Sequence, residues 1–304
     1  MTSAETSHPS VRVAVTGAGG FIGGALVPAL LAQGHAVVRI GRGDTNDVCW
    51  DPMDGPLDPA AIEGVNIVIN LAGESIAQRW TPSRKRAIRE SREQGTRLLA
   101  EACAQLPVRP ELFISASAIG IYGSRGGEVL DESSSTGDDY LSEVGRAWED
   151  ATAPAREAGI RVVCLRTGLV LNPEGGALGK MIGPFKAGLG GTLGPGTQWM
   201  SWISRTDWVR AVQFIIGTPE ISGPVNLTAP GPVTNSIFTS TLGLVLGRAT
   251  VMPVPAFGLT LLYGEMAEGT ILASQRVMPR VLEAAGFDFS HPTLTSALRA
   301  ELRL

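Results

Sequence analysis

The 304-residue sequence is poor in the side chains that most often bind metals or form disulfides. Its three cysteines have no metal-ligand spacing, and an odd number does not suit a disulfide framework, so we expect reduced thiols. Its three histidines, at positions 8, 35 and 291, stand far apart, which argues against a histidine triad. We therefore predict no metal site, and any catalytic centre must rely on other groups.

Charge and long apolar runs are also scarce. Charged residues make up 18% of the chain and the net charge is −4, so nothing favours a nucleic acid or an anionic membrane as partner. No uninterrupted apolar run reaches the roughly 18 residues of a membrane-spanning helix. The polar start, MTSAETSHPS, lacks the apolar region of a signal peptide. We expect a cytoplasmic protein with a small-molecule substrate, preceded by a disordered tail at 1–10.

Short apolar runs alternate with helical patterns through most of the chain, which is typical of βαβ units around a parallel sheet. β-Branched and apolar residues predict buried strands at 11–15, 35–40, 65–73, 111–117 and 160–171. The predicted fold class is therefore α/β: a Rossmann-type doubly wound parallel sheet with a smaller, mainly helical substrate-side and C-terminal portion.

Cap residues mark the helices between these strands. A helix within 21–34 is expected to end at Gly34. Thr81 followed by Pro82 is a cap residue with proline at the first helical position, and it predicts the start of a long helix. A second long helix is expected to start near Asp138 and Asp139 and to stop at Gly159.

The composition of the sequence changes near residue 172, where glycines recur every few residues. Such a stretch resembles an insertion that closes over a ligand more than another sheet layer. We predict a nucleotide-binding domain formed by 11–171 and 202–246, a glycine-rich substrate loop at 172–201, and a small C-terminal domain at 247–304.

The strongest local motif is TGAGGFIG, residues 16–23, between a predicted strand and a predicted helix. Gly17 permits the tight turn, Gly20 lets the backbone approach a pyrophosphate, and Gly23 allows close packing of helix on strand. The helix N-terminus then offers N–H groups to phosphates. The motif predicts dinucleotide binding, with Ala18, Phe21 and Ile22 completing the loop.

The end of the second predicted strand indicates which dinucleotide is bound. An NAD enzyme needs a carboxylate there to accept the ribose 2′-hydroxyl, but the chain has Gly41 followed by Arg42. A guanidinium binds a 2′-phosphate well, and no acid repels it. The predicted cofactor is NADP(H); the alternative is that Arg42 is a solvated loop residue.

Several ordered motifs together give the chain a family resemblance. They are TGAGGFIG (16–23), NLAG (70–73), SASAIGIYG (115–123), GGALGKM (175–181) and GPVNLTAP (223–230), with QRVMP (275–279) near the C-terminus. With these, the chain resembles the atypical and extended short-chain dehydrogenase/reductases. More narrowly, it is similar to the NAD-dependent epimerase/dehydratase-like group, also called putative nucleoside-diphosphate-sugar epimerases, which carry a small C-terminal domain of unknown function.

The resemblance implies further site residues. Beside the glycine loop and Arg42, cofactor contacts are expected from Leu71, Ala72, Gly73, Ser115, Arg166, Thr167 and Val170. Substrate contacts are expected where extended members place their substrate loops, at Gln198, Trp202 and Asp207. The alternative for these three residues is structural packing and helix capping.

The chain departs from the wider family at the catalytic pair. There a tyrosine acts as acid or base, and a lysine one helical turn later lowers the tyrosine pKa. One alignment puts Leu141 and Gly145 at these two places, and the other puts Tyr140 and Val144 there, so both lack the amine. The serine place of the fifth-strand motif holds Ala118, with Ser117 adjacent.

Three functions remain open at this point. The first is an NADP(H)-dependent oxidoreductase acting on a small carbonyl or sugar-like substrate, with Ser117 and Tyr140 as candidate catalytic residues. The second is an NADP(H)-binding sensor or regulatory protein without turnover. The third is a nucleotide-sugar epimerase or dehydratase, ranked lower because that chemistry also uses the missing tyrosine. A homodimer is common in the wider family.

Overall fold

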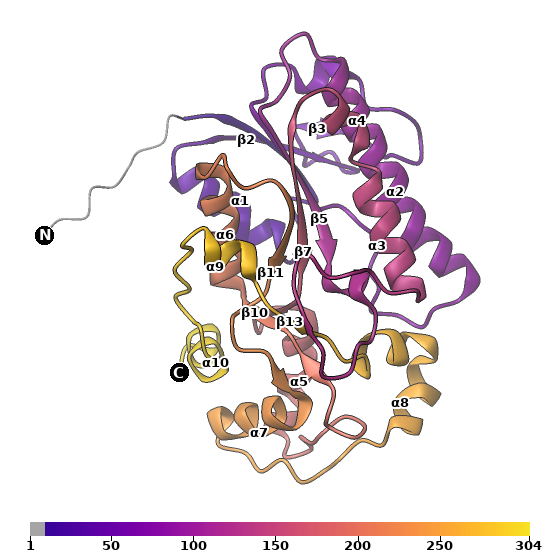
Figure 1. Ribbon diagram of the computed structural model, residues 1–304, viewed down its shortest axis with the longest axis vertical. Coiled ribbons are helices and arrows are strands. Elements are labelled where there is room, and N and C mark those ends of the chain that lie inside the picture. The colour runs from indigo at the N-terminus through magenta and orange to yellow at the C-terminus, as the bar shows by residue number, and fades with distance from the viewer. Residues whose placement is uncertain (1–9) are drawn as a thin grey trace, which may run out of the picture.

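A seven-stranded parallel sheet forms the centre of the computed structural model, which describes residues 10–304 (Figure 1). The strand order is β11-β7-β5-β4-β1-β2-β3, and the chain switches from one side of β1 to the other between β3 and β4. This order confirms the predicted Rossmann-type fold. The predicted tail lies outside the described residues, except for Ser10. The strands are β1 Arg12–Thr16, β2 Ala36–Gly41, β3 Val48–Cys49, β4 Ile67–Asn70, β5 Leu112–Ala118, β7 Arg161–Thr167 and β11 Gly223–Leu227.

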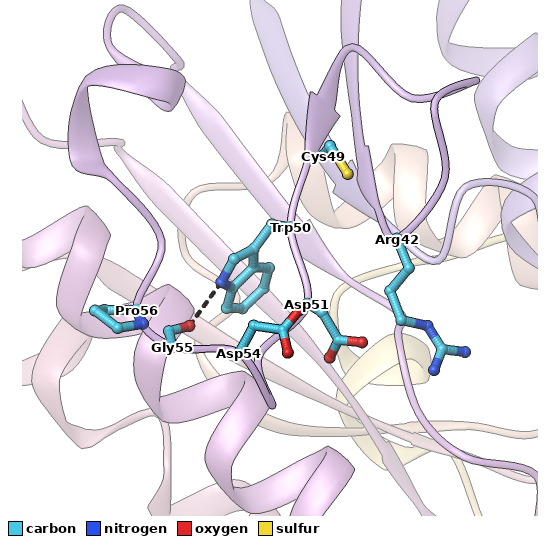
Figure 2. Close-up of a pocket in the computed structure, with 7 residues that line it drawn as sticks. All are labelled: Arg42, Cys49, Trp50, Asp51, Asp54, Gly55 and Pro56. Atoms are coloured by element: carbon cyan, nitrogen blue, oxygen red, sulfur yellow. Dashed lines mark hydrogen bonds between the residues drawn. The ribbon is translucent and has the colours of Figure 1, made fainter.

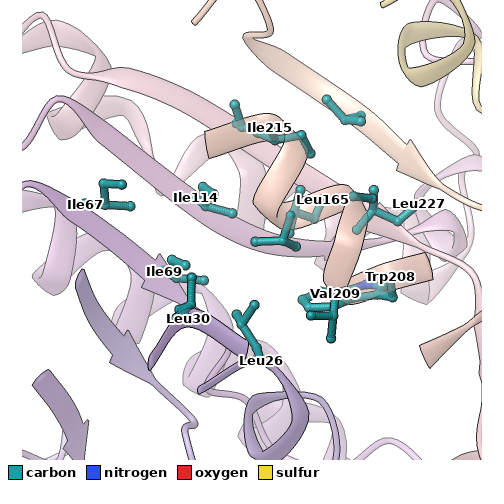
Figure 3. Close-up of a cluster of buried hydrophobic side chains, with 14 of the residues drawn as sticks. Leu26, Leu30, Ile67, Ile69, Ile114, Leu165, Trp208, Val209, Ile215 and Leu227 are labelled. Atoms are coloured by element: carbon teal, nitrogen blue, oxygen red, sulfur yellow. The ribbon is translucent and has the colours of Figure 1, made fainter. Parts of the chain in front are cut away.

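Helices cover both faces of the sheet, which explains why its strands are apolar on both sides. On one face, α1 (Gly23–Ala32) and α6 (Arg205–Gly217) bury Leu26, Leu30 and Trp208 against the strands (Figure 3). On the other face, α2 (Pro82–Gln105) and α4 (Ala153–Glu157) close a second apolar cluster with the short turn Pro59–Ile62.

The predicted helix starts are found where the cap residues stand. The Thr81 hydroxyl accepts a hydrogen bond from the backbone N–H of Arg84, and Pro82 is the first residue of α2. Asp139 accepts one from the N–H of Ser142 and starts α3 (Tyr140–Asp150). The second helix is not continuous to Gly159 as predicted: it stops at Asp150, and α4 restarts where Pro154 occupies the first turn.

The predicted strand at 160–171 is also divided. It runs in the central sheet only to Thr167, and β8 (Leu169–Leu171) then pairs with β10 (Trp202–Ser204) in a separate two-stranded sheet. Gly168 stands at the exit, where a Cβ atom would lie 2.6 Å from the Ser201 carbonyl oxygen. Only glycine permits the close crossing that moves the chain out of the central sheet.

A second lobe follows, below the sheet in Figure 1. The segment 172–201, predicted as a loop, contains helix α5 (Gly176–Lys186), whose Leu178 and Phe185 are buried in a third apolar cluster. The remaining elements are β6 Val129–Leu130, β9 Trp199–Met200, β12 Val233–Thr234, α7 Asn235–Leu246, α8 Ala256–Tyr263, β13 Arg276–Val277, α9 Arg280–Ala284 and α10 Leu294–Leu302, with short turns at Ile119–Tyr122 and Ala267–Ile271.

Two buried carboxylates fasten the C-terminal elements to the rest of the molecule. Asp207 on α6 accepts hydrogen bonds from the backbone N–H groups of Ser290 (2.9 Å) and His291 (2.8 Å). Glu301 on α10 accepts one from Asn172 (2.6 Å) and one from the backbone of Thr206 (3.0 Å). These contacts fasten the C-terminal segment to α6 on the central sheet and to Asn172 in the segment before α5.

One buried ion pair joins α3 to the sheet. The Arg166 guanidinium on β7 donates two hydrogen bonds of 2.8 Å to the Glu149 carboxylate. Glu149 also accepts from the Ser117 hydroxyl at 2.7 Å, while Arg166 donates to the Tyr122 hydroxyl at 3.0 Å. Burial lowers the pKa of Arg166, but the bonds to Glu149 outweigh it and raise the pKa above its ordinary value.

Replacing one partner of this pair tests its contribution to stability. Arg166→Met leaves Glu149 as an uncompensated charge whose side chain is only 15% exposed, so we expect a loss of about 3 kcal/mol in the free energy of unfolding. Urea denaturation measures it. The matched control is Arg97→Met, which breaks an exposed pair with Glu93 and should cost less than about 1 kcal/mol. Equal losses in the two variants would contradict the assignment.

Candidate functional site

The glycine loop after β1 has the geometry that the motif predicts. Gly17 has a left-handed φ of +67°, and a Cβ atom on it would lie 2.9 Å from the backbone carbon of Leu71. A Cβ on Gly23 would collide with the Gly17 carbonyl oxygen. Side chains at Gly17 and Gly23 would therefore separate the loop from β4 and from α1.

A hydroxyl holds the loop after β4 beside the glycine loop. The Thr16 hydroxyl donates to the Asn70 side chain at 2.6 Å and accepts from the backbone N–H groups of Leu71 (3.1 Å) and Ala72 (3.2 Å). Asn70 in turn donates to Thr96 on α2 at 2.8 Å. The structure thus brings together the predicted cofactor residues 17–23 and 71–73 at the carboxyl ends of β1 and β4, where open α/β sheets bind their ligands.

Arg42 lies at the carboxyl end of β2, on the rim of an open pocket of about 350 Å³ (Figure 2). Within residues 10–304 its guanidinium has neither an ion pair nor a hydrogen bond. The pocket is also lined by Cys49, Trp50, Asp51, Asp54, Gly55 and Pro56. Arg42 is the one cationic side chain among these lining residues, and Asp51 and Asp54 are the two acidic ones.

Sequence reasoning did not identify these other pocket residues. They lie at the end of β3 and directly after it; this edge strand has only two residues and pairs with β2 through Ile40 and Gly41. The Trp50 indole donates to the Gly55 carbonyl at 3.0 Å and shapes the turn (Figure 2). The only local signal is the WDP tripeptide at 50–52 directly after Val48 and Cys49, a run too short to predict a strand.

At the other end of the sheet, both places predicted for a catalytic lysine are filled by packing. Val144 is 4% exposed and belongs to a cluster with Trp80 and Ile88. Gly145 faces the turn after β5, and a Cβ atom on it would lie 2.9 Å from Cβ of Ile121. Leu141 lies near Gly120 at a less crowded distance, where a Cβ atom would be 3.4 Å from Cβ of Leu141. Helix α3 therefore approaches the sheet too closely for a lysine at residue 145.

The two predicted catalytic hydroxyls lie in different surroundings. Ser117 is 3% exposed on β5 and donates to Glu149, whereas Ser115 on the same strand is fully buried and bonds locally. Tyr140 lies in the contact between α2 and α3, where its hydroxyl donates to the Lys85 carbonyl at 2.7 Å and its ring meets Trp80 edge-on. Burial raises the pKa of Tyr140, the opposite of what an acid at neutral pH requires.

The remaining residues predicted to contact the cofactor border the same edge. Thr167 ends β7 and accepts a hydrogen bond from the Trp208 indole at 3.1 Å, while Val170 is buried on β8. Arg166 makes its contacts inside the protein, in the pair with Glu149. Ala18 is buried, and Phe21 packs against Gly175 at the start of α5, so the glycine loop contacts the second lobe directly.

The three residues predicted to contact substrate are all buried. Trp202 is fully buried and donates to the Gly231 carbonyl at 2.9 Å, and Asp207 holds the C-terminal segment. Gln198 is 4% exposed; its amide nitrogen donates to the Leu193 carbonyl at 2.8 Å, but its side-chain oxygen has no hydrogen-bond partner in the described chain. Of the three, Gln198 alone retains a free polar atom.

Two general features bear on the class of ligand. Among residues 10–304 no group of three His, Cys, Asp or Glu side chains is placed to hold a metal ion. No helix in this part of the chain has the length and apolarity needed to cross a bilayer.

The tight packing at Gly145 gives a direct test of why the lysine is absent. In Gly145→Ala the new methyl group must displace the stiff Ile121, so we expect a loss of about 1–3 kcal/mol in unfolding free energy, despite the better helix propensity of alanine. Thermal melting without ligand measures it. Gly24→Ala on α1, which meets nothing within 4 Å, is the control and should not destabilise. A stable Gly145→Ala protein would show that the helix has room.

Comparison with known proteins agrees with this geometry. The model of the NAD dependent epimerase/dehydratase family matches residues 13–227, and that of a domain of unknown function (DUF1731) matches 254–301. Epimerase family protein Mb2239 of Mycobacterium bovis is 45% identical over 290 residues, covering 94% of this chain and 96% of that protein.

Two solved structures are similar along nearly the whole chain. Human epimerase family protein SDR39U1 (isoform 2), crystallised with NADPH, has 32% identity and a TM-score of 0.87, covering 96% of this chain and 100% of that one. The nucleoside-diphosphate sugar epimerase of Corynebacterium glutamicum has 38% identity and a TM-score of 0.80, covering 96% and 58%. With the Rossmann fold and the glycine loop, these matches show that the chain belongs to the NAD-dependent epimerase/dehydratase family.

Proposed function

We propose that this chain is an NADP(H)-dependent oxidoreductase that reduces or oxidises a small carbonyl or sugar-like substrate without the usual tyrosine–lysine pair. The observation that carries the cofactor choice is the unpaired Arg42 guanidinium beside an adenosine-sized pocket, at a place where NAD enzymes need a carboxylate. The NADPH in the human SDR39U1 structure supports the same choice.

In this proposal, each part of the cofactor contacts a different part of the site. Arg42 at the end of β2 takes the adenosine 2′-phosphate, and the glycine loop after β1 takes the pyrophosphate. The nicotinamide half then lies over the ends of β4, β5 and β7, beside Gly73, Ser117 and Thr167. When bound, NADPH supplies the hydride, and the protein must orient it and stabilise the substrate oxygen.

Ser117 is the better of the two candidates for contact with that oxygen. It lies one residue before the end of β5, at the edge where the nicotinamide is assigned. Its hydroxyl donates to Glu149 in this structure and would have to turn from that carboxylate to donate to the substrate oxygen. Tyr140 is held by the Lys85 carbonyl in the contact between two helices, so its hydroxyl is committed to the fold.

One observation favours a different function. The place of the catalytic lysine is closed by the contact between Gly145 and Ile121, so the family's usual proton transfer has no group to perform it. A protein that binds NADP(H) and signals the bound state needs no such group. A sensor without turnover is therefore the second candidate.

The cofactor assignment is tested by removing the guanidinium. Arg42→Gln should weaken NADPH binding about 10- to 100-fold, because charge-assisted hydrogen bonds contribute about 1.5–3 kcal/mol. NADH lacks the 2′-phosphate and should bind both proteins alike. Calorimetric titration measures all four dissociation constants. Wild-type protein that prefers NADH would contradict the assignment.

Turnover separates the two candidate functions. We expect wild-type protein to consume NADPH with at least one member of a carbonyl panel, followed by loss of NADPH absorbance. Ser117→Ala should lower the rate about tenfold or more, whereas Tyr140→Phe should change it less than about threefold, since positioned donors contribute about 10²–10⁴-fold when they act directly. Tight NADPH binding with no turnover of any substrate would favour the sensor.

A further inference from the structure

Arg92 on α2 is a charged side chain that the proposed function does not yet use. Its guanidinium lies over the Trp148 ring, 4.8 Å from the ring centre, between α2 and α3. It also lies flat against Gly73, where a Cβ atom would be only 3.3 Å from its central carbon. A side chain at residue 73 would therefore displace the guanidinium from this position.

Hydrogen bonds fix the orientation of this guanidinium. One terminal nitrogen, Nη1, donates to the carbonyl oxygens of Glu74 and Ile88, both at 3.0 Å. An arginine has five N–H donors, so the two bonds leave the Nε–H and the two Nη2–H groups. Within residues 10–304 these donors have no hydrogen-bond acceptor. Arg92 is partly buried, and its unpartnered nitrogens are not among the fully enclosed polar atoms of the described residues, so a ligand can reach them.

Arg92 also lacks a carboxylate partner among the described residues, although acids neutralise most of the neighbouring cations. On the same helix Arg84 pairs with Glu74, Lys85 with Glu265, and Arg89 with Glu93. Burial lowers the pKa of Arg92 to about 10, opposed by Tyr140 and Glu74, so the guanidinium is still charged at neutral pH. A fixed, charged and partly desolvated group with free donors is suited to bind oxygen atoms.

The position of Arg92 indicates which part of the cofactor it can contact. Gly73 is two residues beyond Leu71, which contacts Gly17 of the pyrophosphate loop, and both stand at the carboxyl end of β4. The adenosine end is assigned to Arg42 on the opposite side of β1, next to β2 and β3. The part of the dinucleotide that passes Gly73 is therefore the nicotinamide half.

We propose that Arg92 is a cofactor-binding residue that donates hydrogen bonds to oxygen atoms of the nicotinamide half of NADP(H). It supplies from α2 the positive charge that the wider family supplies from a lysine on the helix corresponding to α3, where Gly145 leaves no room. This inference rests on the proposed cofactor but not on turnover.

The test compares two ligands that share the adenosine end. NADPH has the nicotinamide half, whereas adenosine 2′,5′-bisphosphate does not. In Arg92→Gln the affinity for NADPH should fall about tenfold or more, and the affinity for the bisphosphate should stay within about twofold of wild type. Calorimetry gives both dissociation constants. Arg97→Gln, an exposed arginine on the same helix, is the matched control and should change neither.

Each other result counts against the inference or against its premise. Unchanged NADPH affinity in Arg92→Gln, or equal losses for the two ligands, overturns the inference, since equal losses indicate a purely structural role. If that variant does not fold, Arg92→Lys keeps the charge but loses the planar donor geometry, and NADPH affinity should then fall selectively. Wild-type protein that binds neither ligand overturns the cofactor assignment instead.

Discussion

The pair between Glu149 and Arg166 determines where α3 lies, and the site depends on that position. It joins α3 to β7 directly and to β5 through Ser117. The hydrogen bonds continue from Arg166 to the Tyr122 hydroxyl and from there to Asn226 on β11. One buried polar network therefore joins α3 to the adjacent strands β5, β7 and β11. Burial raises the pKa of Tyr122 to about 12, opposed by Arg166, so the phenol stays neutral and remains a hydrogen-bond donor to Asn226. A partly satisfied network of this kind would be costly, which favours one precise arrangement.

With α3 held in this position, the missing catalytic pair has a structural explanation. The same closeness that lets Glu149 reach Ser117 brings Gly145 against Ile121 and Leu141 against Gly120. A lysine on this helix would require α3 to move outward and would stretch the ion pair. Under our proposals the positive charge comes from α2 instead, where the small Gly73 makes room for a guanidinium. The fold is thus an ordinary Rossmann fold in which, under our proposals, the positive charge of the site comes from a different helix.

Local signals made the frame predictable from sequence. The left-handed turn at Gly17, the contact of Gly23 with Gly17, the caps Thr81 and Asp139, and the β-branched strands all depend on nearby residues, so the fold and the cofactor loop could be predicted. Contacts between distant residues could not be read in this way. Glu149 and Ser117 are 32 residues apart, and nothing near Gly145 indicates that Ile121 will face it. The point at which the chain leaves the central sheet, Gly168, and helix α5 in the glycine-rich segment depend likewise on partners elsewhere in the chain.

The carboxylates of Asp207 and Glu301 have a consequence for how the molecule unfolds. Both are nearly completely buried, and each accepts backbone N–H groups from a segment far away in sequence. Melting of the stretch before α10 would leave the buried Asp207 carboxylate with Arg210 as its remaining partner. Melting of α10 would remove Glu301, the acceptor for the Asn172 amide and the Thr206 N–H. Local opening of the C-terminal segment is therefore expensive, and the two lobes are expected to lose structure in one cooperative transition rather than in two.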